Sequence, residues 1–269
     1  MPGWNVTGLL ATVLLVHAIA MWASRWPAAA AQGGPLPGVA AAPVPDVLRV
    51  GTFNIHAGKD AHGQRHLDRT AAALAGLRLD FIGLNEVSAC AVWNNDNQAA
   101  ALGRQLEMTS LFAPGERRYG RDWYGNGLLS RFAVSHWQRT PLPATQERGH
   151  RATLQADLDW NGTTLHFLIV HLDRRRDRAA QLKLVAGQFL QLPPPAILLG
   201  DLNSTSDDPI LRQLLISGDV QDPLAQAGCD GQSRVDWILT RGMQSTAAGV
   251  VDSGASDHPA CWAELRLAE

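Results

Sequence analysis

The chain has 269 residues, of which 46% are hydrophobic, so it can bury one sizeable core as a single domain. Its 23 Lys and Arg residues against 25 Asp and Glu residues give a formal net charge of −2. This balance excludes a global basic field that would draw the protein to nucleic acid or to an anionic membrane, so nucleic acid is not the default partner.

An apolar run occupies residues 8–23 near the start of the chain. It is shorter than a typical membrane span but long enough for the core of a signal peptide, and the small residues 29–31 provide a cleavage site before Gln32. No Lys or Arg precedes the run, although a signal peptide normally has one, so an uncleaved anchor helix fits equally well. Both alternatives predict an exported protein, which is periplasmic, secreted or membrane-anchored with its domain outside the cytoplasm.

The composition divides the chain into three parts. Residues 1–31 are predicted to be the signal peptide or the membrane anchor. Residues 32–46 are rich in Ala, Pro and Gly and are expected to form a linker. Residues 47–269 are expected to form the folded domain, which begins with a strand at Val47.

Short apolar runs alternate with helical patterns in the first half of this domain. The predicted elements are a strand at 47–55, a helix at 66–79, a strand at 81–84, a helix at 98–106, and a strand that begins at 127 after a polar loop at 114–126.

In the second half, Asn161-Gly162 is a strong signal for a two-residue hairpin between strands at 152–160 and 163–170. The further elements are a helix at 177–192, a strand at 196–199, a helix that starts at Asp208-Pro209, and strands at 235–240 and 261–267. Antiparallel hairpins mixed with helices that return to a strand predict an α/β fold, in which two packed mixed β-sheets are flanked by helices as a four-layer sandwich.

Polar side chains follow the predicted strands at five places. The segments are Phe53-Asn54-Ile55, Asn85-Glu86-Val87, Val170-His171-Leu172, Gly200-Asp201-Leu202-Asn203 and Ser256-Asp257-His258-Pro259, with Arg234-Val235-Asp236-Trp237-Ile238 before the last. In this order the motifs resemble the endonuclease/exonuclease/phosphatase superfamily of DNase I-like, metal-dependent phosphohydrolases. The resemblance spans about residues 48–267 and implies the same four-layer fold.

The resemblance implies that Glu86 is a metal ligand and that Asp257 binds the metal or a water. A hard cation such as Mg²⁺, for which Mn²⁺ can substitute, prefers carboxylates in an open, hydrated site. Taken alone, Glu86 would be read as a surface carboxylate at a strand end. Asn85 stands where the family usually has Gln, and His56 stands where some relatives carry Asp, so the sequence leaves open whether one or two metals bind.

The resemblance also implies the residues that act on the scissile bond. Asp201 and Asn203, on the same side of an extended chain, are expected to position or deprotonate the attacking water. His258 is expected to be the general base or a phosphate contact, and Asp236 is expected to orient it and raise its pKa. His171 is expected to contact the scissile phosphate. Which of Asp201 and His258 takes the proton stays open.

Further residues are candidates for substrate binding. By resemblance, Asn54 contacts the phosphate and Asn126 is a loop amide near the substrate. Arg148 or Arg151 could neutralise a phosphate oxygen, although solvated surface arginines are an equal alternative. The charges at 174–178 could steer an anionic substrate to the site rim, or they form a solvated helix start.

The three cysteines match no zinc-binding spacing. Cys261 falls in the last apolar strand and is expected to be a buried thiol. In an exported protein, Cys90 and Cys229 could form a disulfide, which the sequence does not decide.

The motifs together predict a Mg²⁺-dependent hydrolase of phosphoester bonds, a phosphodiesterase acting by in-line water attack. Short loops argue against the DNA-gripping insertions of repair nucleases. The alternatives are a secreted nuclease acting on DNA or RNA, and a non-catalytic envelope binding module on the same scaffold. The expected partner is a phosphoester substrate. Further candidate partners are nucleic acid and a membrane, which the N-terminal segment would bind. The protein is expected to be a monomer.

Overall fold

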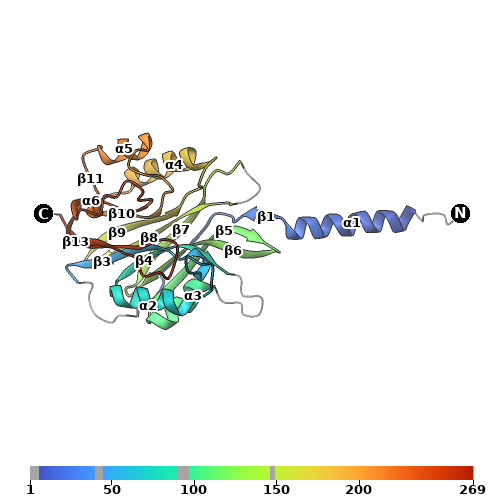
Figure 1. Cartoon of the computed structure of the whole chain (residues 1–269), viewed down its shortest axis with the longest axis horizontal. Helices are drawn as coiled ribbons and strands as arrows, with labels where there is room; N and C mark the ends of the chain where they lie inside the picture. Colours follow the sequence, from blue (N-terminus) through green and yellow to red (C-terminus); the bar gives the residue numbers. More distant parts are fainter. Residues whose placement is uncertain (1–5, 40–44, 90–96, 146–148, 269) are drawn as a thin grey trace.

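A computed structural model describes residues 6–39, 45–89, 97–145 and 149–268. Helix α1 (Val6–Ala23) extends away from a body made of two packed β-sheets (Figure 1). The helices of the body are η1 (His56–Gly58), α2 (Leu67–Leu77), α3 (Gln98–Leu106), α4 (Arg178–Gln191), α5 (Pro209–Leu215) and α6 (Pro223–Gln226).

Each sheet has seven strands in the described part of the chain. The first sheet has the order β1 (Arg25–Pro27), β5 (Thr109–Arg118), β6 (Arg121–Ser130), β4 (Phe81–Ser88), β3 (Leu48–Asn54), β14 (Ala260–Leu267) and β13 (Met243–Val251). The second has the order β11 (Val220–Gln221), β12 (Asp236–Arg241), β10 (Ala196–Asp201), β9 (Thr163–His171), β8 (Ala152–Trp160), β7 (Val134–Pro141) and β2 (Ala31–Gly33).

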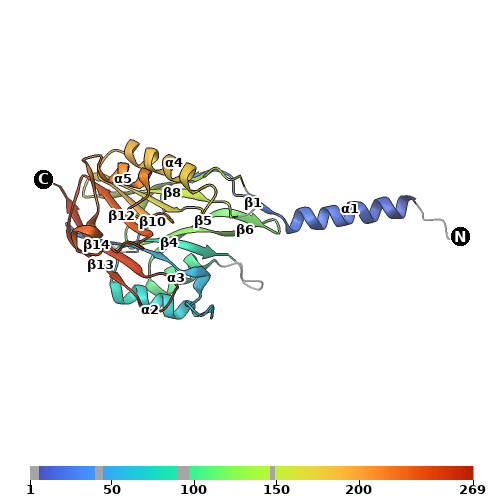
Figure 2. The same ribbon diagram turned by 45° about the horizontal axis from the view of Figure 1, so that its top comes forward.

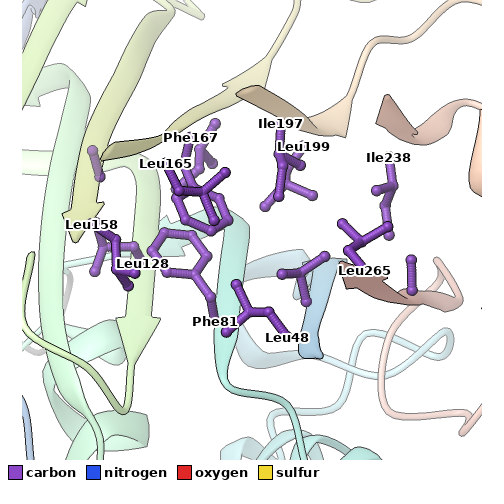
Figure 3. Packing of buried hydrophobic residues seen from close by; sticks show 14 of the residues in the cluster. Leu48, Phe81, Leu128, Leu158, Leu165, Phe167, Ile197, Leu199, Ile238 and Leu265 are labelled. Carbon is purple, nitrogen blue, oxygen red and sulfur yellow. The ribbon is translucent and has the colours of Figure 1, made fainter. Parts of the chain in front are cut away.

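The two sheets form the inner layers of the body and the helices form the outer ones. Helices α2 and α3 cover the outer face of one sheet, and α4 and α5 cover that of the other (Figure 2). The main hydrophobic core lies between the sheets. At its centre the ring of Phe81 from β4 stacks on that of Phe167 from β9, with the ring centroids 3.6 Å apart (Figure 3). The predicted four-layer α/β sandwich is therefore confirmed.

Two local predictions are confirmed by backbone geometry. Asn161 and Gly162 have φ angles of 53° and 85°, as a two-residue turn between twisted strands requires. The carboxylate of Asp208 accepts hydrogen bonds from the backbone N–H groups of Ile210 and Leu211, so it caps α5.

The predicted polar loop at 114–126 is wrong, because these residues belong to the hairpin of β5 and β6. Its turn is formed by Tyr119 and Gly120, whose φ angles are 53° and 71°. The strand register shifts after Pro114, which has no N–H for the ladder. The polar residues near the tip face solvent, so they carried no apolar pattern. Strands β7 and β13 were not predicted for a similar reason, since both mix polar and apolar residues.

The N-terminal segment also differs from the expected start of the fold at Val47. Strand β1 pairs with β5, and β2 pairs with β7, so residues 25–33 contribute to both sheets. In the described part of the chain, no helix has the length and apolar character needed to cross a membrane.

The buried thiol predicted at Cys261 is confirmed, since this residue is buried in the core between the sheets. Cys229 is a free thiol in the described part of the chain. Cys90 lies outside the described residues, so its pairing with Cys229 stays a prediction.

Candidate active site

The site lies where the carboxyl ends of strands from both sheets meet. Strands β3 and β4 run parallel in one sheet, and β9 and β10 run parallel in the other. Parallel strands end at the same edge of a sheet, so Asn54, Asn85, His171 and Asp201 are brought to one edge. The amide Nδ2 of Asn54 lies 3.1 Å from Asp201 Oδ2 across the two sheets, and both side chains are buried.

Asn85 holds the two sheets together beneath this edge. Its Nδ2 donates to Asn126 Oδ1 at 2.9 Å and to Val170 O at 2.8 Å, and its Oδ1 accepts from the backbone N–H of Asp201 at 2.9 Å. Asn85 is fully buried, so each of these bonds satisfies a group that water cannot reach. The sequence marked this residue only as a departure from the family, and its support of the site was missed.

Asn126 lies in β6 rather than in the predicted loop. Besides accepting from Asn85, its amide donates to Ala152 O at 2.8 Å. The side chain is buried, and its oxygen and nitrogen both have protein partners. The structure therefore places Asn126 beneath the site, as a support for Asn85.

Asp201 lies at the centre of the polar cluster. Besides the bond from Asn54, its Oδ2 lies 3.5 Å from His171 Nε2 and 3.9 Å from His258 Nε2. Its Oδ1 accepts from the backbone N–H of Asn203 at 2.8 Å. Burial and the neighbouring charge of Asp236 raise the pKa of Asp201 to about 6.

Asn203 does not follow Asp201 on an extended chain, as the sequence analysis expected. Its φ angle is 47°, so the chain turns left-handed at this residue. The turn is stabilised by the N–H bond to Asp201, and the amide Nδ2 of Asn203 donates to Leu172 O at 2.9 Å. Asn203 thus connects the ends of β9 and β10.

His258 and Asp236 form the predicted imidazole–carboxylate pair. Nδ1 of His258 lies 2.7 Å from Asp236 Oδ2. Burial lowers the pKa of His258, but the hydrogen bond and the charges of Asp236, Asp201 and Asp257 outweigh burial and raise this pKa to about 9. The imidazole is therefore protonated at neutral pH, with its Nε2 directed toward Asp201.

His171 has the opposite electrostatic environment. Its Nδ1 lies 3.2 Å from Nη1 of Arg151, so Nδ1 accepts and the proton is assigned to Nε2. Burial, with the charges of Arg151, His258 and Arg174, lowers the pKa of His171 well below its usual value. Arg151 thus lies in the site, whereas Arg148 is outside the described residues.

Glu86 is directed into the site by a break in β4. The register with β6 shifts between Leu84 and Val87, and Glu86 has a φ angle of 59°. Its Oε1 lies 3.3 Å from Asn54 Nδ2 and 4.0 Å from His171 Nε2. The sequence located this carboxylate, but the bulge that orients it has no sequence signal.

Asp257 lies near the backbone of Asn54. The Oγ of Ser256 donates to Asn54 O at 2.7 Å and lies 3.3 Å from Asp257 Oδ1. Nδ1 of His56 lies 3.4 Å from the same oxygen of Asp257. The structure therefore brings His56 to this carboxylate, a contact that the sequence analysis did not predict.

One group of side chains within the described residues is close enough to hold a cation. Asp201, Asp236 and His258 have ligand atoms within 4.8 Å of one another. However, the last two already bond to each other, so a cation at this group would have to displace that bond and the imidazole proton. The side chains of Glu86 and Asp257 are 23% and 41% exposed, which leaves room for the waters that a hard cation keeps. The partial exposure of Glu86 and Asp257 therefore suits them as oxygen ligands of a hydrated divalent cation.

Tyr124 and a neighbouring cavity were missed by the sequence analysis. Burial and the negative charge of Glu86 raise the pKa of Tyr124 well above its usual value. A cavity of about 460 Å³ lies beside His258. It is lined by Cys229, Gly231, Ser233, Arg234, Val235, Asp236, Val250, Asp257, His258, Pro259 and Cys261. Neither feature has a motif that could have identified it.

Solved structures share this fold over most of their length. The endonuclease/exonuclease/phosphatase from Beutenbergia cavernae is 23% identical, with a TM-score of 0.66 over 83% of this chain and 72% of that chain. The human Nocturnin catalytic domain is 17% identical, with a TM-score of 0.63. The match covers 84% of this chain and 97% of the Nocturnin domain. Danio rerio TDP2, complexed with a single-strand DNA product, is 17% identical, with a TM-score of 0.61. The match covers 82% of this chain and 100% of the TDP2 chain.

No curated protein matches the chain. The profile of the Endonuclease/Exonuclease/phosphatase family matches residues 51–258, a range that includes each of the five strand-end motifs up to His258. As the motifs predicted, the chain belongs to this family of metal-dependent phosphoester hydrolases.

Proposed function

We propose that the protein is an exported, Mg²⁺-dependent phosphodiesterase that cleaves its substrate by in-line attack of water. The observation that carries this proposal is the convergence of Asn54, His171 and His258 on one carboxylate oxygen of Asp201. A buried carboxylate with one oxygen that faces an amide and two imidazoles is suited to hold a water beside a phosphoryl group.

Asp201 is the proposed acceptor of the water proton. Its pKa of about 6 leaves it ionised at neutral pH, yet close enough to the working pH for efficient proton transfer. His258, held protonated by Asp236, then stabilises the negative charge that develops on the phosphoryl oxygens. These opposite protonation states favour Asp201 over His258 as the general base.

The neutral imidazole of His171 and the amide of Asn54 donate hydrogen bonds to the substrate phosphate in this proposal. Arg151 is the cation behind His171, and it fixes the tautomer that carries the proton on Nε2. Glu86 and Asp257 would hold Mg²⁺, which supplies Lewis-acid polarisation of a phosphoryl oxygen. Water attacks directly, so no covalent enzyme intermediate forms.

The test is hydrolysis of bis-(p-nitrophenyl) phosphate, p-nitrophenyl phosphate and plasmid DNA by the full chain, with Mg²⁺, Mn²⁺ or EDTA. The Asp201→Asn variant is compared with Asp207→Asn, which changes the same group at a position 83% exposed. We expect metal-dependent cleavage of the diester that only Asp201→Asn abolishes. Preferential cleavage of DNA would establish the nuclease alternative. A folded protein that leaves all three substrates intact would contradict the hydrolytic proposal and favour the binding module.

A further inference from the structure

The segment that follows α1 is built into the domain. Ala28 is buried and its N–H donates to Gly115 O at 2.9 Å, between the pairings of β1 and β2. The guanidinium of Arg139 donates to Ala29 O at 2.7 and 2.9 Å. Residues 25–33 therefore contribute strand pairing and buried contacts to both sheets.

An ion pair strengthens this connection. Nη1 of Arg25 lies 2.8 Å from Oε1 of Glu116, whose side chain is only 1% exposed. The other oxygen of Glu116 accepts from the N–H of Gly149 at 2.8 Å. Cleavage after Ala31 would remove β1 together with Arg25 and leave the buried carboxylate without its cation, which is strongly destabilising. The native contacts therefore require the segment that connects the domain to α1.

Helix α1 is apolar on every side and has no charged residue. The following side chains are more than half exposed: Leu9, Leu10, Val13, Leu14, Leu15, Val16 and Ile19. In both views the helix extends away from the domain without packing on it (Figures 1 and 2). A helix that is hydrophobic all round needs an apolar environment, and the described part of the domain does not supply one.

Aromatic and basic residues gather where α1 meets the domain. Trp26 follows the helix and is 46% exposed. Across the strand pairing from it lies the tip of the β5–β6 hairpin, where the guanidinium of Arg118 lies over the rings of Tyr119 and Trp123 at 4.5 and 5.5 Å. We call Trp26, Arg117, Arg118, Tyr119, Arg121 and Trp123 the rim.

The rim has the chemistry of a membrane–water interface. Among the described residues of β1 and the hairpin tip, its three arginines and Arg25 stand against two carboxylates, Glu116 and Asp122, so this described surface is locally basic although the chain is not. Tryptophan and tyrosine collect at the headgroup level of bilayers, and basic residues there are attracted to anionic lipids. An apolar helix followed directly by such residues fits a lipid surface better than a protein partner.

The rim also lies next to the candidate active site. Ser88, two residues after Glu86, pairs with Tyr124, and the β5–β6 hairpin continues from there to its tip. The end of β4 that carries Glu86 and the end of α1 that joins the domain are therefore on the same side of the domain (Figures 1 and 2).

We propose that residues 6–33 stay on the mature protein, that α1 embeds in a lipid bilayer without crossing it, and that the rim docks on anionic headgroups with the active site facing the membrane. The proposal goes beyond the hydrolytic function and does not depend on it. Of the two alternatives for residues 1–31, the uncleaved anchor helix is therefore favoured over the cleaved signal peptide.

The first test is the intact mass of the full chain after expression and export, recovered from the membrane fraction with detergent. We expect a mass that includes α1 and β1. A mature protein that starts at Gln32, or at any residue between α1 and Gln32, would overturn the retention of the segment.

The second test is flotation of the full chain with vesicles of phosphatidylcholine, with and without one quarter phosphatidylglycerol. We expect binding that is on the order of tenfold stronger to the anionic vesicles, and loss of this preference in R117Q/R121Q. The control R131Q/R266Q removes the same charge from exposed positions outside the rim and should keep the preference.

Each result of the flotation decides one part of the proposal. No binding to either vesicle would overturn the embedding of α1. Equal binding to both vesicles, or an unchanged preference in R117Q/R121Q, would overturn the rim as the docking surface. Hydrolysis of soluble bis-(p-nitrophenyl) phosphate is expected to be unchanged in R117Q/R121Q, which confirms its folding. If no variant shows hydrolysis, circular dichroism supplies that control and the membrane result still stands.

Discussion

His258 bonds to Asp236 through Nδ1 at 2.7 Å, while its Nε2 faces Asp201 Oδ2 at 3.9 Å. One imidazole thus lies between two carboxylates that repel each other. The arrangement raises the pKa of His258 to about 9, and burial together with Asp236 raises the pKa of Asp201 to about 6. Between these pH values the site holds an anion and a cation side by side.

Removing the charge of Asp236 should change both the activity and the protonation of its partner. In Asp236→Asn we expect kcat to fall at least about 100-fold, because the protonated state and orientation of His258 are lost. Titration of the His258 ring by NMR should show its pKa falling toward about 6.5, the ordinary value for histidine. An unchanged pKa would contradict the role assigned to Asp236.

The same pair predicts how stability depends on pH. His258 has a higher pKa folded than unfolded, so its stabilisation is complete below about 6.5 and is lost as the pH rises through about 9. The difference corresponds to about 3 kcal/mol at most. Urea unfolding of the wild type between about pH 6 and 10 should show this decline, and Asp236→Asn should lack it. Parallel curves for the two proteins would contradict the linkage.

Asp201 should set the acid limb of the activity. If it accepts the water proton, kcat/KM for bis-(p-nitrophenyl) phosphate should fall about tenfold per pH unit below about pH 6, because the protonated carboxyl cannot act as a base. Asp207→Asn is expected to keep this limb. A flat profile down to about pH 4.5 would show that another group takes the proton.

Several acids and imidazoles of the site could be predicted from the sequence because they follow an apolar strand pattern. Asp236 begins β12, and Asp257 and His258 precede β14, so these three were identified by their motifs alone. Asp201 and His171 end β10 and β9, two strands whose buried residues gave a clear signal. The strand pairing then brings their side chains to one edge. The positions of Asp201 and His171 thus depend on which strands are neighbours in the sheet. The order of the motifs along the chain, through the family resemblance, already implied that arrangement.

Other features depend on backbone geometry and on distant contacts. The left-handed turns at Glu86 and Asn203 break the alternation of side chains, so a strand pattern cannot orient those residues. Arg151 was one of two candidates until its contact with His171 was known. The pairing of Arg25 with Glu116 joins residues 91 positions apart, and no local pattern encodes such a contact.

Metal affinity should distinguish the two candidate cation positions. We expect Glu86→Gln and Asp257→Asn each to raise the Mg²⁺ concentration for half-maximal activity at least about tenfold, because each removes a charged oxygen ligand. Glu264→Gln, which neutralises a partly exposed carboxylate on β14, is the matched control and should leave this concentration unchanged. Calorimetric titration with Mg²⁺ measures binding independently of turnover. If only Asp236→Asn weakens Mg²⁺ binding, the cation lies at Asp201, Asp236 and His258.

The buried amide of Asn85 should contribute to both folding and activity. Asn85→Ala removes three hydrogen bonds and leaves the amide oxygen of Asn126 and the N–H of Asp201 without the partner that the wild type supplies. We expect a loss of about 2–4 kcal/mol in the free energy of unfolding, measured by urea denaturation. We also expect kcat to fall at least about tenfold under conditions where the variant is folded, because the backbone that carries Asp201 is no longer held in place.

The control for this substitution is a second asparagine whose side chain has a purely local role. Asn97 caps α3 by accepting a hydrogen bond from the N–H of Ala100, and it touches none of the site residues described above. Asn97→Ala should cost about 1 kcal/mol of unfolding free energy and leave kcat unchanged. Because both substitutions delete the same amide, the difference between them isolates what the position of Asn85 between the two sheets contributes. Equal effects on stability and kcat would contradict the support role of Asn85.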